Sequence, residues 1–558
     1  MDRLFLRGLV REIEARVRGC RIKDARLQPS TRTLSLGLGM PQRPRLVLRL
    51  DAASALYLGP SDSVGGVAAE REKKLTRLLG GAMIEAIRAE PLDRVVTFRL
   101  VQTRVSGRKR ELSLVLELLG TQRSAFLVSE DTGLVIDSFG AADSSERVGR
   151  ARPERSPPPN AASEARSVSE LEQRLDALPD GLEHETLLRA TGWTPLLVRE
   201  LRYLVESCEL SLGAAFEEIA ARLERASPVL YVEGRKSTLS PIELGHIDGA
   251  YARACEGFND AMLQAAHHTD QLRRIEAGRG RLANALSRRL KSHRSLQKKL
   301  RSQLEGLDEP EHLRVRAETL LAGLTSVTRV SADLVRLPDA FDPEGRLIEL
   351  SVDPRFDLRT NAERWFRRSR KIERSKLEIG RRLESLDQQV HFVEGFVFAL
   401  EDAHELVVIE DLVEQAERAS LLQPLRDRGA SRTIERALPR VYESRRGNRI
   451  LVGRSARSNE EVTFRHAQPE DLWFHAAGRA GSHVALRRLV PGPFDDGEIV
   501  EAAELAAYFS KARRESLVDV QYTERRHVSK IKGAPPGLVK VDRIRVVRVA
   551  PRARAEKS

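Results

Sequence analysis

Two long stretches with heptad-like spacing constrain the fold of this chain more than any other feature. Between residues 272 and 304, and again between 372 and 400, Leu, Ile and Val recur mostly at steps of three or four residues. This spacing is typical of helices with one apolar stripe. The two stretches bracket a strand-like, turn-rich piece at about 318–360. The pattern therefore predicts an antiparallel coiled-coil hairpin, within residues 227–435, that carries a small folded middle element.

The N-terminal part of the chain predicts an α+β domain followed by a linker. Residues 1–138 start with an amphipathic helix and continue with alternating apolar and polar runs that are typical of strands. The strand-like runs lie at 33–40, 45–52, 94–102, 111–120 and 124–131. Residues 139–169 hold Ser, Ala, Pro and charge but almost no large apolar side chains, which predicts a flexible linker.

The remaining segments complete a multidomain α+β fold. Residues 170–226 predict a helical, helix-hairpin-helix-like domain in which one helix starts at Thr194 and Pro195. Residues 436–558 are again mixed α/β and contain a helical run at 498–515. The predicted fold class is therefore a mixed α/β N-terminal domain, a helical domain, a coiled-coil hairpin with a middle element, and a mixed α/β C-terminal domain.

The positive charge of the chain is concentrated in three segments. The whole chain has 94 Lys and Arg against 81 Asp and Glu, a net charge of +13. Residues 271–301 carry 11 basic side chains and one acid, residues 361–382 carry nine and three, and residues 436–558 carry 25 and 15. The first segment has almost no acid of its own to pair with, so contact with phosphates is favoured over a solvated face. The cations that we expect to bind RNA there are Arg288, Arg289, Lys291, Lys298, Lys299 and Arg301.

Several classes of protein are not supported by the sequence. No apolar run approaches the roughly 20 residues of a membrane helix, and the N-terminus lacks the apolar core of a signal peptide. The chain has only Cys20, Cys208 and Cys255, so neither a disulfide framework nor a zinc site is expected. It also lacks the phosphate-binding loop, HExxH and GxSxG templates. We therefore expect a cytoplasmic protein that is not an enzyme and holds no metal or cofactor.

One aromatic cluster in the C-terminal segment points to RNA. The run from Asp471 to His475 contains adjacent Trp473 and Phe474, which would lie on opposite faces of a strand. One ring would then pack in the core, and the other could face a ligand together with His475 and His483. The surrounding cations favour an RNA-contacting face, although a core tryptophan with satisfied histidines would also fit the pattern. These cations are Arg479, Arg487, Arg488, Lys511, Arg513 and Arg514.

The same segment resembles a known family. Residues 450–486 and 502–541, with the patterns D-x-W-F-H, G-S-H and A-A-x-L-A-A-Y-x-S-K-A-R, are similar to the RNA-binding module of the NFACT family. These proteins are ribosome quality-control factors of the RqcH and NEMF type, also known in bacteria as fibronectin-binding protein A homologues. The resemblance extends to the N-terminal domain, to the segment before the coiled coil and to the middle element with its returning arm. The segments that carry it are 5–22, 91–100, 228–244 and 341–375.

The resemblance implies a function and a set of site residues. Such proteins bind a large ribosomal subunit that is obstructed by peptidyl-tRNA and bring in charged tRNA, alanyl-tRNA in the bacterial case. The ribosome then adds a C-terminal tail that marks the stalled chain for degradation. Expected partners are therefore tRNA, rRNA and a small S4-like RNA-binding protein. The family's Asp-Arg pair for tRNA engagement falls on Asp93 and Arg94. Its RNA-binding positions fall on Asp471, Trp473, Phe474, His475, Ser482 and His483, and we add the neighbouring Arg479, Lys511 and Arg513.

The chain departs from the family pattern at two places, and three further functions are weighed against it. Ala480 stands where the family usually has Pro, and the loop at 120–125 differs from the family's Gly-Arg-x-Ser-Asn. A DNA glycosylase is disfavoured because Asp2 and Arg3 replace the Pro and Glu that such enzymes use. A fibronectin-binding adhesin is disfavoured by the lack of a signal peptide. It and a general RNA- or nucleic-acid-binding protein, both without tailing activity, are the remaining alternatives.

Overall fold

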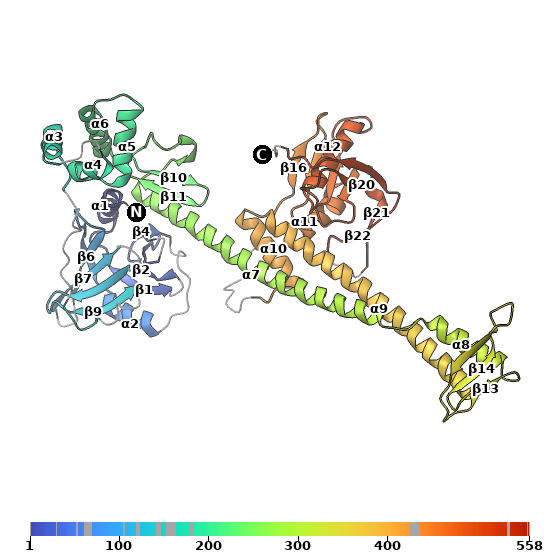
Figure 1. Cartoon of the computed structure of the whole chain (residues 1–558). Coiled ribbons are helices and arrows are strands. Elements are labelled where there is room, and N and C mark those ends of the chain that lie inside the picture. The colour runs from blue at the N-terminus through green and yellow to red at the C-terminus, as the bar shows by residue number, and fades with distance from the viewer. Residues whose placement is uncertain are drawn as a thin grey trace. The chain divides into compact units, whose positions relative to one another are not determined.

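The computed structural model has the multidomain α+β fold that the sequence predicts, arranged in two compact units (Figure 1). The units are residues 1–273 and residues 274–558, and each is described by itself. The structure describes residues 2–28, 31–51, 54–60, 70–103, 107–118, 123–140, 147–151, 163–178, 183–424, 436–532, 536–554 and 556.

Two antiparallel sheets pack with α1 (Arg3–Val17), with α2 (Glu70–Leu79) and with the start of the long helix α7 (Phe258–Glu305) in the first core of the N-terminal unit. The strands of the first sheet, in spatial order, are β1 (Ile22–Gln28), β2 (Thr33–Leu38), β3 (Arg45–Arg49) and β4 (Ala55–Gly59). Those of the second are β5 (Met83–Ala89), β6 (Val95–Thr103), β7 (Lys109–Glu117), β8 (Ser124–Ser129) and β9 (Val135–Gly140). The helix α1 (Arg3–Val17) buries its apolar face, including Leu6, Leu9 and Ile13, in this core. The helix α2 (Glu70–Leu79) is held to β1 by the carboxylate of Glu72, which accepts from the backbone N–H of Leu27 at 2.7 Å.

Four helices form a second core in the same unit. They are α3 (Val168–Asp176), α4 (His184–Thr191), α5 (Pro195–Glu206) and α6 (Leu212–Arg225). As predicted, α5 starts at Pro195 with Thr194 as its N-cap. The rings of Trp193 and Phe216 stack in the core, with centroids 4.6 Å apart. A small sheet follows, whose strands are β10 (Val229–Glu233), β11 (Lys236–Ser240) and β12 (Ala252–Arg253), with a 3-10 turn at Gly249–Tyr251 before the last strand.

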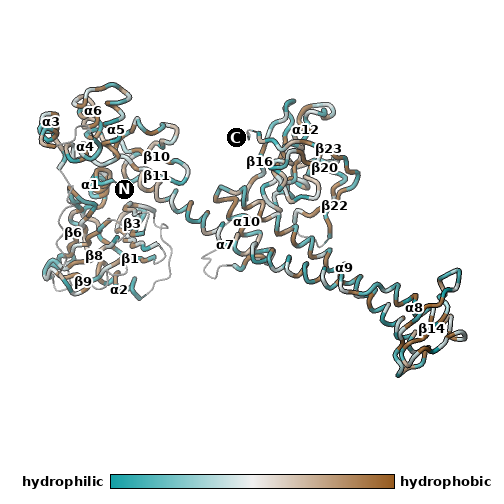
Figure 2. Tube along the Cα trace, viewed as in Figure 1, coloured by the Kyte–Doolittle hydropathy of each residue, from teal (hydrophilic) through white to brown (hydrophobic). Residues whose placement is uncertain are grey.

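Two long helices confirm the predicted hairpin. The helix α7 (Phe258–Glu305) starts in the N-terminal unit and continues into the second unit, where α9 (Leu358–Glu401) runs antiparallel to it. Hydrophobic and hydrophilic residues alternate in short segments along both helices (Figure 2). Their apolar residues share one core with α10 (Leu406–Arg418). The amide of Gln297 donates to Asp387 at 2.5 Å and fixes the register between the helices.

A small element joins the two long helices. It consists of α8 (Pro310–Ala322) and the three-stranded sheet of β13 (Thr328–Arg329), β14 (Leu334–Pro338) and β15 (Leu347–Ser351). Its core includes Leu320, Leu337 and Leu350, together with Ala362 near the start of α9. This element corresponds to the predicted middle element of the hairpin.

The C-terminal part of the second unit is built on a six-stranded antiparallel sheet. In spatial order its strands are β16 (Arg440–Glu443), β17 (Arg449–Val452), β19 (Val484–Arg487), β18 (Leu472–Ala476), β20 (Val518–Glu524) and β23 (Arg545–Val549). The alanine-rich helix α12 (Asp496–Tyr508) packs on this sheet and begins with a capping box formed by Asp495 and Glu498. The remaining elements are α11 (Ala456–Glu461), a π-helical turn (Val462–His466), a 3-10 turn (Arg525–His527) and the hairpin of β21 (Val528–Lys530) and β22 (Val539–Val541).

The observed elements differ from the predicted ones in three places. Strands β1, β4, β5 and β9 were not predicted, because charged or short segments hide their alternation. The predicted helix at 498–515 ends at Tyr508, since the following backbone turns back to bond the 480–482 segment.

The third difference concerns the predicted linker at 139–169. Its described residues make specific contacts: the backbone N–H of Val135 bonds the carbonyl of Arg150, and Ala165 is buried. Residues 141–146 and 152–162 of this range lie outside the described residues. The domain boundaries stay predictions.

Candidate nucleic-acid interface

The predicted aromatic cluster lies on β18, a central strand of the C-terminal sheet. Phe474 is fully buried in the core between the sheet and α12, with Leu472 and Ala476 on the same face. Trp473 and His475 lie on the opposite face, as the alternation of a strand requires.

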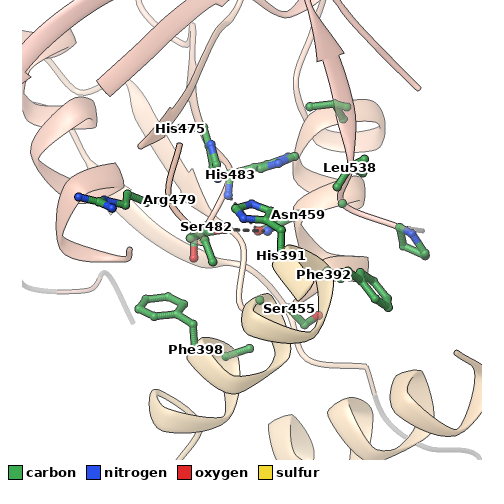
Figure 3. A pocket seen from close by; sticks show the side chains of 18 of the residues that line it. His391, Phe392, Phe398, Ser455, Asn459, His475, Arg479, Ser482, His483 and Leu538 are labelled. Carbon is green, nitrogen blue, oxygen red and sulfur yellow. Dashed lines mark hydrogen bonds between the residues drawn. The ribbon is translucent and has the colours of Figure 1, made fainter. Parts of the chain in front are cut away.

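A cavity of about 270 Å³ lies beside this face of the sheet (Figure 3). It is lined by Trp473 and His475 of β18, by Ser482 and His483 before β19, and by residues of α9, α11 and the segment before β22. In Figure 3, the rings of His475, His483 and His391 cluster near its centre, while Phe392 and Phe398 lie on α9. The predicted residues that line the cavity are Trp473, His475, Arg479, Ser482 and His483.

The two histidines of β18 and the following loop are uncharged at neutral pH. Burial lowers the pKa of His475 to about 4, and the neighbouring His391 acts in the same direction. Burial lowers the pKa of His483 to about 3, with a smaller effect of His475. Their rings lie 5.4 Å apart, and that of His483 also meets Trp473 edge-on at 5.0 Å. The centre of the cavity is therefore aromatic and neutral.

A hydrogen-bond network holds the Gly-Ser-His segment in place. The side-chain oxygen of Asn459 accepts from the backbone N–H of His483 at 3.0 Å, and its amide nitrogen donates to the carbonyl of Gly481 at 3.2 Å. The hydroxyl of Ser482 donates to the carbonyl of Gly453 at 2.6 Å. Gly453 is required here, because an added Cβ would lie 2.1 Å from the Asn459 side-chain oxygen. The segment that carries Ser482 and His483 is thus fixed before any ligand arrives.

Two buried donors on residues of the cavity wall have no partner in the described part of the chain. The indole N–H of Trp473 is buried and makes no hydrogen bond with the residues that the structure describes. The same holds for the Nε–H of Arg454, whose other nitrogens bind Glu405 at 2.8 Å and Glu556 at 3.0 Å. Buried polar groups are normally satisfied, so such donors suggest a missing acceptor.

Four of the predicted C-terminal residues do not line the cavity. Asp471 is buried and accepts from the backbone N–H of Arg488 at 2.9 Å, and Phe474 belongs to the core. Lys511 pairs with Glu394 at 3.3 Å. Arg513 pairs with Asp402 at 3.2 Å and lies over the ring of Tyr508. The contact of these residues with RNA stays a prediction.

The cations of α7 divide into a paired and an unpaired set. In the second unit the paired set consists of Arg274, Arg281 and Arg294, which bind the acids Glu410, Glu417 and Glu394 of α9 and α10. In the N-terminal unit, Arg273 of the same helix pairs with Asp51. The unpaired row, as we name it, is exposed and makes no ion pair with any described acid. Its members are Arg288, Arg289, Lys291, Lys298 and Lys299. The sixth predicted residue, Arg301, is exposed and lies 3.8 Å from Asp387. Acids of α9 and α10 thus compensate part of the positive charge of α7, and the charge of the unpaired row is not compensated by a described acid.

The predicted Asp-Arg pair lies in a turn and not within a strand. Asp93 and Arg94 are half-buried in the turn between β5 and β6, where the Asp93 carboxylate accepts from the backbone N–H of Arg94 at 2.8 Å. Among the described residues, Arg94 makes no ion pair, and its bond to Asp93 is through its backbone N–H. Arg123 lies close enough for the charge of Arg94 to contribute to lowering its pKa, after the larger effect of burial. Two cations are thus close together beside this turn. Residues 120–122 of the divergent loop lie outside the described residues.

The residues at the start of α1 have structural roles. The Asp2 carboxylate caps the helix by accepting from the N–H of Leu4 at 2.8 Å. The guanidinium of Arg3 donates to the carbonyls of Pro91 and Gly192. The bond to Pro91 holds the turn that precedes Asp93. Neither the Asp2 nor the Arg3 side chain has the chemistry of a glycosylase nucleophile.

Sequence reasoning missed several residues of these sites. Arg454, Asn459 and His391 line the cavity, and Arg123 neighbours Arg94. A signal was present for Arg454 and Asn459, which stand in the run 450–486 that resembles the family module, and for Arg123, which stands in the loop at 120–125. His391 comes from the coiled-coil arm, and no local pattern marks it.

Two features are absent from the part of the chain that the structure describes. No helix in the described ranges is long and apolar enough to span a membrane. Within the same ranges, no three His, Cys, Asp or Glu side chains gather in a group that could hold a metal ion.

Curated proteins similar to this chain cover most of its length. It is 26% identical over 491 residues to "Rqc2 homolog RqcH" of Bacillus subtilis (strain 168), which covers 86% of this chain and 85% of the relative. It is 25% identical over 567 residues to a protein of the same name from Streptococcus suis (strain 05ZYH33), which covers 99% and 98%.

Solved structures cover about half of the chain. The C-terminal part of a fibronectin/fibrinogen-binding protein from Streptococcus suis matches with a TM-score of 0.39 and 25% identity, over 50% of this chain and 96% of that one. The fibrinogen binding protein from Staphylococcus aureus matches with a TM-score of 0.38 and 20% identity, over 47% and 97%.

Two family descriptions match consecutive parts of the chain. "NFACT N-terminal and middle domains" matches residues 2–433, and "NFACT protein RNA binding domain" matches residues 439–542. Since the first match alone covers more than half of the 558 residues, the chain belongs to the NFACT family.

Proposed function

We propose that this protein is a cytoplasmic ribosome quality-control factor. It binds large ribosomal subunits that are obstructed by peptidyl-tRNA and recruits charged tRNA, of the alanyl class, for template-independent tailing of the stalled chain. The peptide bond forms at the ribosomal peptidyl-transferase centre, so the protein acts by positioning tRNA and makes no bond itself. Its further partners are rRNA and a small S4-like RNA-binding protein.

Family membership over nearly the whole chain is the observation that carries this proposal. The two matched regions leave only residues 434–438 and 543–558 and the first residue uncovered. The relatives named Rqc2 homolog RqcH align over 86% to 99% of the chain, so the similarity is not confined to one domain. A general RNA-binding protein would need the RNA-binding domain alone.

The distribution of free charge supports a division of labour between the two units. The unpaired row on α7 offers five exposed cations to phosphates, and cations on a rigid helix suit a large folded RNA. In the N-terminal unit, the turn with Arg94 and the neighbouring Arg123 offer a smaller basic site, which suits one tRNA. We assign subunit binding mainly to the second unit and tRNA engagement mainly to Asp93 and Arg94.

Sedimentation and RNA identification test the proposal. Tagged full-length protein, purified from cells in which translation is stalled, should sediment with free large subunits and release one predominant tRNA on extraction. Sequencing that tRNA identifies the amino acid of the tail. Recovery of the protein with small subunits, with no RNA, or with all cellular RNAs in proportion to their abundance would refute the proposal. Binding to immobilised fibronectin in place of ribosomal subunits would favour the adhesin.

A further inference from the structure

We propose that the cavity beside β18 takes a single unstacked base of an RNA strand, while the sugar-phosphate chain of that strand passes outside the cavity near Arg479. The inference deepens the proposed function and rests on it only in taking RNA as the ligand. It assigns the recognition of one nucleotide to this cavity. RNA binding in general requires only a positively charged surface.

The size of the cavity fits one ring system. Its volume is about 270 Å³, whereas an apolar cavity of about 150 Å³ already accepts a benzene ring. Pockets for larger ligands start at about 300 Å³. One purine or pyrimidine therefore fits, and a dinucleotide does not.

The interior favours a neutral aromatic ligand over an anion. His475 and His483 are neutral at pH 7 because burial lowers their pKa to about 4 and about 3. Two arginines of the wall have side chains only 13% exposed and are already paired, Arg440 with Asp402 and Arg454 with Glu405. A phosphate deep in the cavity would thus have to displace one of these carboxylates. A base, by contrast, can pack against the rings that line the cavity, which is how proteins hold unstacked bases.

The unpartnered donors supply the polar part of the recognition. Trp473 and Arg454 each carry a buried N–H without an acceptor among the described residues, and both residues line the cavity. Ring nitrogens and carbonyl oxygens of bases are acceptors of the required kind. A ligand without such atoms would leave both donors unsatisfied.

Arg479 is suited to hold the strand at the entrance. Its side chain is exposed and forms an exposed pair with Glu515 at 3.1 Å. Such pairs contribute little to stability, so the guanidinium can exchange the carboxylate for a phosphate at low cost. In Figure 3 it lies at the edge of the group of labelled side chains.

Two glycines on α9 provide a matched pair of variants. Gly395 lines the cavity, and an added Cβ there meets no atom within 4 Å, so a leucine at this position has room to extend into the cavity. Gly380 lies on the same helix away from the cavity, and its Cβ would also meet no atom within 4 Å. Both Gly→Leu changes favour the helix, so only G395L should block the site.

The experiment measures binding of nucleotides to the full-length protein by calorimetry and by ligand-observed NMR. The probes are the four nucleoside 5′-monophosphates, ribose 5-phosphate, inorganic phosphate and a short single-stranded RNA. We expect at least one monophosphate to bind, the single-stranded RNA to compete with it, and ribose 5-phosphate and phosphate not to compete. G395L should weaken nucleotide binding by about tenfold or more, the effect expected when one base loses its aromatic contacts, and G380L should leave it unchanged.

Three results would overturn the inference. Equal binding of ribose 5-phosphate and the nucleotides would identify an anion site, and nucleotide binding without competition by RNA would identify a site for free nucleotides. Equal affinities of G395L and G380L would show that the base lies elsewhere. Trp473→Phe keeps a ring and removes the N–H, so it should also weaken binding and serves if G395L does not fold. Subunit sedimentation of the same variants separates the proposals: nucleotide binding without subunit binding in the unmodified protein would refute only the proposed function.

Discussion

The unpaired row on α7 yields a quantitative prediction for the salt dependence of RNA binding. Each cation that contacts a phosphate releases counterions, so the logarithm of the binding constant falls linearly with the logarithm of the salt concentration. Cations that are already held by a carboxylate contribute much less, because their charge is compensated in the free protein. The structure therefore predicts that the two sets of cations on one helix differ in their effect on this slope.

The size of the effect follows from the number of free cations. Replacing all five members of the unpaired row by Ala should reduce the slope by about 3.5 to 4.5, since each phosphate contact contributes about 0.7 to 0.9. Over a fourfold rise in salt, the unmodified protein should then lose about two to three orders of magnitude more affinity than the variant. The lowered pKa of His293 is consistent with a positive potential around the unpaired row. Burial lowers this pKa most, and the charge of Arg289 lowers it further.

The assay is binding of purified large ribosomal subunits to labelled protein over a series of salt concentrations. The matched control replaces Arg274, Arg281 and Arg294, which lie on the same helix but are paired with acids. This control should change the slope by less than about 1 in total. Thermal melts of both variants show whether the hairpin still folds.

Equal changes in slope per replaced cation in the two variants would refute the reasoning. The distinction between paired and free cations would then have no bearing on RNA binding. An unchanged slope in the five-residue variant would show that the row remains a solvated face when the protein is on the ribosome.

Three further predictions concern the other sites. Replacing Asp93 and Arg94 together by Ala should abolish tailing in a reconstituted assay but preserve subunit sedimentation; loss of both would contradict the assigned roles. Because His475 and His483 titrate lower in the fold than the usual 6.5, the unfolded chain binds more protons as pH falls, so stability should decline from about pH 6.5 toward pH 4. Substituting both by Gln should flatten this decline in denaturant titrations, and an unchanged slope would exclude them as its cause. Phe474→Ala should destabilise the C-terminal domain by about 3–5 kcal/mol in urea unfolding, and a loss below about 1 kcal/mol would mean that Phe474 is not a core residue.

Local periodicity was sufficient to predict the long elements. The apolar steps of α7 and α9, the Thr194-Pro195 start of α5 and the alternation in β2, β3, β6, β7 and β8 all appear in the structure. The strands that were missed carry charge or are short. β1 reads IKDARLQ, and its inward residues are held by pairing with β2 and by bonds to α2, neither of which a local pattern contains.

Charge patterning was less informative, because pairing depends on the tertiary fold. In sequence, the 271–301 segment has a single acid for 11 cations. In the structure, the partner of Arg294 is 100 residues away and that of Arg274 is 136 residues away. The sequence could therefore locate the basic helix but not divide it into free and compensated cations.

The candidate site shows the same limit. The motif identified Trp473, His475 and His483, and strand alternation placed Trp473 and Phe474 on opposite faces. The cavity itself required the packing of α9 against the C-terminal sheet, which brings His391 and Phe398 to the motif. The uncharged state of the histidines is also a result of that burial, since an exposed histidine would titrate near neutrality.

Two carboxylates connect the coiled-coil arm with the C-terminal domain and link the two candidate RNA contacts. Glu394 of α9 pairs with Arg294 of α7 at 2.8 Å and with Lys511 of the C-terminal domain at 3.3 Å. Asp402, the C-cap of α9, binds both Arg440 and Arg513. These pairs cross from the arm to the domain, so the unpaired row and the cavity belong to one connected body. An RNA that engages both sites therefore makes the second contact at the high effective concentration set by the first, but only if its own shape matches their spacing. A folded RNA of fixed geometry can hold such a spacing permanently, whereas a random strand reaches it only transiently, which under the proposed function would favour a ribosomal subunit as the partner.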